Sequence, residues 1–248
     1  NCYEDTVTAL MNKFTQLNIN VTGAYYLRFA DSTVQSICAT KWGDGTGITK
    51  AQCAAVSSIG TIFAYNTSIT TFNEFKYFTG ITNSSVNWSD RWFAGCTSLK
   101  SIIIPKNLLR MWADVSGFNG CTSLSDVTWD ADSKMTIFVN GMFALCTSLL
   151  YLDAPNSVTK VEGGTFVNAS KLKKLTFGNN VSYFGHNGNW NGYNKTIILN
   201  TSVPPTIDSY GMEAEWYVPD ASLNAYNNAT NWTKLVGHIH ALSTYTGN

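Results

Sequence analysis

One heptapeptide decides the fold of this chain, because it occurs three times in nearly identical form: FAGCTSL at 93–99, FNGCTSL at 118–124 and FALCTSL at 143–149. A weaker copy, FVNASKL, follows at 166–172. The phenylalanines that open the four copies are 25, 25 and 23 residues apart. Such regular spacing predicts a stack of structural repeats in which each repeat contacts only its neighbours.

Each heptapeptide is followed by a short stretch that favours β-structure: KSIIIP at 100–105, SDVTWD at 125–130, LYLDAP at 150–155 and KKLTFG at 173–178. Side chains alternate between the two faces of a strand. If the last leucine of each heptapeptide points inward, two strand residues per repeat also point inward, namely Ile102, Ile104, Val127, Trp129, Leu152, Ala154, Leu175 and Phe177. We therefore expect Trp129 and Cys121 to be buried in a continuous core.

A period of 23 to 25 residues lies within the range of leucine-rich repeats. The fold predicted is an α/β solenoid, a leucine-rich-repeat stack of about five coils with one parallel strand per coil. A helical N-terminal cap and a strand-helix-strand C-terminal cap should close its ends, because end coils would otherwise expose core and sheet edge. The expected division is 1–80 for the first cap, 81–202 for the solenoid and 203–248 for the second cap.

The caps carry their own signals. An amphipathic helix is expected at 4–17, with one apolar stripe made of Val7, Leu10, Met11, Phe14 and Leu17. Asp31 is expected to cap a second helix, and Thr49 a third that runs through residue 58. In the C-terminal cap, Asp220 is expected to cap a helix through Asn231.

The composition excludes some functions. Only 13% of the residues are charged, against a usual ~25%, and the net charge is zero. The densest basic spot is the pair Lys173 and Lys174, so the concentrated cationic surface that nucleic-acid binding needs is absent. The sequence contains no run of ~18 apolar residues, so no transmembrane helix is predicted. Asn, Ser, Thr, Gly and aromatic residues replace the missing charge, a composition that favours a secreted protein.

The heptapeptide F-x-G-C-T-S-L followed by a strand ending in Ile-Pro resembles the BspA-like leucine-rich-repeat family of bacterial surface proteins. The likeness extends to the segments YLRFAD at 26–31, FNEFKYFTG at 72–80 and WYVPD at 216–220, and so covers roughly residues 25–240. The resemblance implies a cell-surface or secreted location, binding or adhesion roles, and no catalytic residues. It also implies that the turn at 42–48 is a degenerate EF-hand loop. Lys41, Gly43, Gly45 and Gln52 occupy positions where calcium ligands would stand, so no ion is expected there.

We therefore predict a binding or adhesion module, not an enzyme, whose partner is a host protein or a glycan. Alternatives are a structural spacer that displays another domain, or an accessory part of a glycan-degrading system. The expected location is extracellular or at the cell surface. Cys2 leaves open a lipid anchor, as in an outer-membrane lipoprotein, although an ordinary thiol is favoured.

The candidate binding residues are the outward strand positions of the middle coils. One column should contain Ser101, Asp126, Tyr151 and Lys174, and the next should contain Ile103, Thr128, Asp153 and Thr176. Solenoids commonly present the concave face of such a sheet to partners. Asp126, Thr128, Tyr151, Asp153 and Lys174 are the candidate ligand-binding residues, with ordinary solvated strand residues as the alternative. A loop at 186–193 that contains Trp190 and Tyr193 is the second candidate.

No cofactor or metal site is expected. Cys96, Cys121 and Cys146 recur every 25 residues and should lie one above another, so disulfides are an alternative to free core thiols. Cys38 and Cys53, on the second and third predicted helices, are likewise either a disulfide or two free thiols. His238 and His240 share one face of a predicted strand, but no third metal ligand is near them in the sequence.

Overall fold

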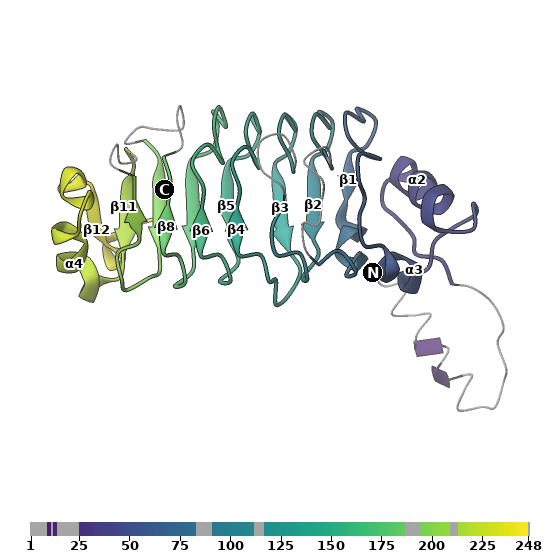
Figure 1. Ribbon diagram of the computed structural model, residues 1–248, viewed down its shortest axis with the longest axis horizontal. Coiled ribbons are helices and arrows are strands. Elements are labelled where there is room, and N and C mark those ends of the chain that lie inside the picture. Colours follow the sequence, from purple (N-terminus) through teal and green to yellow (C-terminus); the bar gives the residue numbers. More distant parts are fainter. Residues whose placement is uncertain are drawn as a thin grey trace.

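The computed structural model describes residues 9–10, 12–13, 25–82, 91–111, 117–186, 194–208 and 213–247. In Figure 1 the strands stand side by side in one long row, with helices α2 and α3 at one end and α4 at the other. This is the capped stack of parallel strands that the repeated heptapeptides predict. The leucine-rich-repeat solenoid is therefore confirmed.

Parallel strands form three sheets. The first contains β1 (Thr71–Phe72), β2 (Ser101–Ile104) and β3 (Asp126–Trp129). The second, here called the five-stranded sheet, contains β5 (Tyr151–Asp153), β7 (Lys174–Phe177), β9 (Thr196–Leu199), β11 (Glu215–Val218) and β12 (Ile239–Ala241). The third contains β4 (Ile137–Phe138), β6 (Lys160–Val161), β8 (Tyr183–Phe184) and β10 (Thr206–Ile207). The strand expected after each heptapeptide is present, and several coils carry a second, shorter strand.

The core lies between the five-stranded sheet and the sheet of short strands. The ring centroids of Phe177 on β7 and Phe184 on β8 are 5.3 Å apart. The phenylalanines that open the heptapeptides stack in a column, with centroids 5.5 Å apart between Phe93 and Phe118 and 5.7 Å apart between Phe143 and Phe166. Each coil thus buries its apolar face against its neighbours, as repeat stacks require.

The phenylalanine column extends one coil further than the sequence indicated. The segment FAYNTSI at 63–69 places Phe63 on Phe93 at 5.6 Å, and the strand β1 that follows it pairs with β2. Asn66 and Ile69 stand where the other copies have cysteine and leucine, which conceals this copy in the sequence. Parallel stacking of the coils therefore begins within residues 1–80, the range expected for the N-terminal cap.

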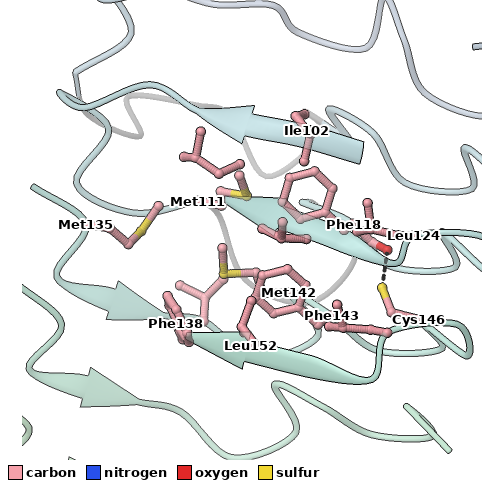
Figure 2. Close-up of a cluster of buried hydrophobic side chains, with 14 of the residues drawn as sticks. Ile102, Met111, Phe118, Leu124, Met135, Phe138, Met142, Phe143, Cys146 and Leu152 are labelled. Atoms are coloured by element: carbon pink, nitrogen blue, oxygen red, sulfur yellow. Dashed lines mark hydrogen bonds between the residues drawn. The ribbon is translucent and has the colours of Figure 1, made fainter. Parts of the chain in front are cut away.

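The cysteines of the heptapeptide form a ladder of weak hydrogen bonds. The Sγ atoms of Cys96, Cys121 and Cys146 donate to the carbonyl oxygens of Phe63, Phe93 and Phe118, at 2.9, 3.0 and 3.2 Å. Figure 2 shows the last of these bonds beside the Phe118 and Phe143 rings. All five cysteines of the described residues are free and buried, so the free-thiol alternative is the one that the structure shows.

Strand pairing is interrupted between β3 and β5, which belong to different sheets. In the register that joins β2 to β3, Asp130 donates its N–H to Ile104, and the equivalent donor on the next coil would be Pro155, which has no N–H. The Trp129 indole spans this gap and donates to the Asp153 carbonyl at 2.8 Å. Trp129 is therefore only half-buried, although its ring stacks on Phe138, and the full burial predicted for it is wrong.

The N-terminal cap contains two helices, α2 (Ser32–Trp42) and α3 (Lys50–Ala55). Asp31 caps α2 as predicted, and its other carboxylate oxygen accepts bonds from Thr70 at 2.6 and 2.8 Å, which joins the cap to the first coils. Thr49 caps α3 with Gln52 in a capping box, and α3 ends at Ala55 rather than at 58.

In the turn at 42–48, the Asp44 carboxylate accepts hydrogen bonds from the backbone N–H groups of Thr46 and Gly47 at 2.9 and 3.0 Å. It therefore closes the turn itself. Of the apolar stripe expected at 4–17, only Leu10 is described, and its side chain is 51% exposed. The other four positions and Cys2 lie outside the described residues.

Within the range expected for the C-terminal cap, 203–248, β11 is followed by α4 (Leu223–Asn228), the short 3-10 helix η3 (Trp232–Leu235) and strand β12. The ring centroids of Trp216 and Tyr226 each lie 4.8 Å from that of Trp232, and all three side chains are buried. Asp220 does not cap a helix. Its Oδ1 instead accepts from the Ser243 N–H at 3.0 Å, which ties the chain after β12 back to the end of β11.

Candidate ligand-binding face

Side chains on the exposed face of the five-stranded sheet form two columns fixed by strand register. In the first column Tyr151 pairs with Lys174, Lys174 with Thr196, and Thr196 with Glu215. Asp153 pairs with Thr176, and that column continues to Ile198, Tyr217 and His240. The inward residues between them, such as Leu152 and Leu175, are buried, so the rigid core determines where the outward side chains stand.

The predicted binding residues divide between two sheets. Tyr151, Asp153 and Lys174 lie together on β5 and β7. Asp126 and Thr128 are exposed as expected, but they lie on β3, across the interruption in strand pairing. Trp190 and Tyr193 lie outside the described residues.

Aromatic rings flank the ammonium group of Lys174. Its Nζ lies 5.5 Å from the centroid of Tyr151 and 5.9 Å from that of Tyr245, distances that fit cation–π contacts. Tyr151 is 51% exposed, so one side of this arrangement is open to solvent. Tyr245 follows the last 3-10 helix and comes back over the sheet, where its ring lies 4.9 Å from that of Tyr217.

A carboxylate joins the two histidines at the far end of the same face. The Glu215 Oε1 lies 2.9 Å from the His238 Nδ1, and its Oε2 lies 2.5 Å from the His240 Nε2. Burial alone would raise the pKa of Glu215, but the bonds from His240 and His238 outweigh it and hold that pKa below its ordinary 4.5. The His240 ring also lies 5.1 Å from Tyr217, so aromatic and charged groups run continuously from β5 to β12.

Sequence reasoning missed half of this face. Glu215, Tyr217 and Tyr245 were not candidates, because their contacts with Lys174, His238 and His240 join segments that are far apart in the chain. The signal that could have found the first two is the period itself. Extending the outward columns past Lys174 and Thr176 by strand register leads to Glu215 and Tyr217.

The opposite sheet carries a polar cluster of a different kind. Tyr183 donates to the Asp208 carboxylate at 2.7 Å, which raises the pKa of Tyr183 to about 12. Lys160 pairs with Glu162 at 3.0 Å and lies 5.5 Å from the Tyr183 ring. These groups satisfy one another, whereas Tyr151 and its surroundings leave polar and aromatic surface open to a ligand.

Among the described residues, no group of three or more His, Cys, Asp and Glu side chains could hold a metal ion. The same part of the chain contains no helix with the length and hydropathy to cross a bilayer.

Comparison with known proteins agrees with the geometry. The profile of the BspA type leucine rich repeat region matches residues 75–194, in six copies. A search of curated proteins finds no match. The matched range begins just after β1 and takes in the four heptapeptides, their strands and β4, β6 and β8. Residues 75–194 of this chain therefore match the BspA-type leucine-rich-repeat family.

Proposed function

We propose that this chain is an extracellular or cell-surface binding module that attaches to a glycan or a host protein through the exposed face of its five-stranded sheet. The observation that carries the proposal is the row of outward side chains from Tyr151 to His240, which the sheet register holds in fixed positions. Leucine-rich-repeat solenoids are typically non-catalytic scaffolds for interactions, and the resemblance of the sequence to surface proteins supports the location.

The physical argument rests on preorganisation. A ligand that meets side chains already fixed by a packed core loses less conformational entropy on binding than one that must order a loop. Tyrosine offers a large contact area with only two side-chain torsions and a hydroxyl at its tip. Tyr151 combines this chemistry with 51% exposure, and Lys174 and Asp153 beside it supply charges of both signs.

The test begins with the purified chain on a glycan array and on a panel of extracellular-matrix proteins. For any ligand found, Tyr151→Ala and Lys174→Ala should each weaken binding by about tenfold or more, as central aromatic and charged contacts do. Tyr65→Ala is the matched control, because Tyr65 is 58% exposed but lies on the turn before β1, which belongs to another sheet. Equal loss in the control, or no loss in either test variant, would place binding elsewhere.

Asp126→Ala extends this test to the neighbouring sheet. A loss of affinity with Asp126→Ala would show that the ligand bridges the interruption between β3 and β5. Binding to no member of either panel would favour the spacer function instead.

A further inference from the structure

One edge of the candidate face carries positive charge without matching negative charge. Four lysines from two neighbouring coils make up this edge, here called the lysine rim: Lys171, Lys173, Lys174 and Lys195. Lys171 and Lys173 are exposed. Among the described residues, no ion pair joins a carboxylate to any of these four lysines.

Strand register places two of these lysines next to each other. Lys173 and Lys195 come directly before the paired strands β7 and β9, and the Thr196 N–H donates to the Lys173 carbonyl at 2.8 Å. Lys195 is only 9% exposed, and its ammonium donates to the Ser170 carbonyl at 3.1 Å. Burial, reinforced by the charge of Lys173, lowers the pKa of Lys195. The rim therefore contains like charges that repel one another and that an anion would relieve.

Exposed apolar surface lies beside the lysine rim, on the coil that precedes it in the chain. Leu150 and Tyr151 are 38% and 51% exposed, and Lys173 donates its N–H to the Leu150 carbonyl at 2.8 Å. The Tyr151 ring thus lies beside the ammonium of Lys174 with an open face. Ammonium groups beside an exposed ring and an exposed leucine suit a ligand that has both anionic groups and apolar C–H faces.

We propose that the lysine rim and the Tyr151 ring form a binding site for an acidic polysaccharide. The sulfate or carboxylate groups of the polymer would pair with Lys171, Lys173 and Lys174, and one sugar ring would lie on Tyr151. The inference rests on the proposed function, since it names the ligand class of the same face.

Two features favour a polysaccharide over an acidic peptide. Extended peptides commonly bind by adding a strand to a sheet edge. β7 lies between β5 and β9, and on β5, the edge strand, the Asp153 carbonyl already accepts the Trp129 indole N–H. Lys171 and Lys173 are exposed in one coil, and the exposed Tyr151 ring stands on the coil before it, so charge and a flat aromatic surface are offered together, as a charged sugar polymer requires. Asp153, two residues beyond Tyr151 on β5, bounds the site on its other side and directs the anionic groups toward the rim.

The experiment compares four immobilised polymers: heparin as a sulfated glycan, polygalacturonate as a carboxylated one, dextran as a neutral one, and polyglutamate as an acidic peptide. The test variant is Lys171→Gln/Lys173→Gln/Lys174→Gln. The matched control, Lys41→Gln/Lys106→Gln/Lys134→Gln, removes the same charge from exposed lysines elsewhere. Thermal unfolding of each variant shows that the fold is intact.

We expect binding to heparin or polygalacturonate that weakens at least tenfold in the test variant and less than threefold in the control, with Tyr151→Leu also weakening it. Binding should fall as NaCl rises from about 0.05 to about 0.5 M, since ions screen exposed charges. Heparin alone would identify sulfate as the group recognised, and polygalacturonate alone would identify carboxylate.

Three results would overturn the inference: equal loss in both triple variants, binding to polyglutamate as tight as to either acidic glycan, or no binding to either acidic glycan. If the chain then bound a neutral glycan or a protein in a manner sensitive to Tyr151→Ala, the proposed function would stand and only the acidic ligand class would fail.

Discussion

At the scale of single residues, the cysteine of the heptapeptide shows why this side chain suits its position. The carbonyl of Phe118 accepts the N–H of Cys121 within its own turn and the S–H of Cys146 from the next coil. A thiol fills a fully buried site as a small hydrophobic group and still donates weakly to an oxygen that has a second lone pair. A serine at this position would also donate a hydrogen bond but would fill less apolar volume. A valine would fill the apolar volume but would have no donor.

The first prediction separates these two contributions. Cys146→Val should lower the free energy of unfolding by about 0.5–1.5 kcal/mol through the lost hydrogen bond. Cys146→Ala should lower it by more, up to about 3 kcal/mol, because it also leaves a cavity. Urea denaturation measures both. If the alanine variant were as stable as the wild type, the thiol ladder would contribute nothing to the stack.

At the scale of structural elements, Trp129 holds together two sheets that backbone hydrogen bonds do not join. Its indole N–H bonds to the Asp153 carbonyl, and its ring stacks on Phe138 at 5.4 Å. Trp129→Phe should keep the stacking and cost about 1 kcal/mol, the usual net value of one hydrogen bond. Trp129→Ala should cost more, yet less than the ~3–5 kcal/mol of a fully buried aromatic residue, since the side chain is only partly buried.

Hydrogen exchange on these variants provides the control for that prediction. Amide exchange in β3 and β5 should accelerate in Trp129→Ala, while β9 and β11, at the far end of the five-stranded sheet, keep their protection. Uniform acceleration along the whole stack would mean that Trp129 supports the core in general and does not bridge the two sheets.

The sequence predicted those elements that the repeat determines directly. β2, β3, β5 and β7 lie where the heptapeptide places them, and Asp31 and Thr49 cap the helices that their residue types indicated. The short strands β4, β6, β8 and β10 have two residues each, too few for an alternating pattern to be recognised. The interruption at Pro155 and the bonds of Glu215 to two histidines depend on contacts between coils, which local pattern does not encode.

At the scale of the whole molecule, buried and hydrogen-bonded carboxylates predict sensitivity to acid. Burial alone would raise the pKa values of Asp31 and Glu215, but bonds from Thr70, Val34 and Thr33 to Asp31, and from the two histidines to Glu215, bring both below their ordinary values of 3.8 and 4.5. Their contribution to stability is therefore fully present above those values and is lost as the pH falls through the lower, folded-state pKa values.

Denaturant unfolding from pH 7 down to about pH 3 tests this expectation. Stability should begin to fall only as the pH passes below about 4.5, and Glu215→Gln should flatten the upper part of that decline. Asp31→Asn should reduce stability already at neutral pH, because one side chain both caps α2 and binds Thr70. An unchanged pH profile in Glu215→Gln would contradict the role assigned to the histidine bonds.

If the exposed face of the five-stranded sheet is the binding surface, a bound ligand should cover the lysines on it. The most direct measurement is the acetylation rate of each lysine, followed by mass spectrometry, with and without a saturating ligand from the binding panels. Bound ligand should slow acetylation of Lys173 and Lys174 several-fold and leave that of Lys134, which is exposed on another part of the molecule, unchanged. Protection of Lys134 with none at Lys173 and Lys174 would contradict this prediction.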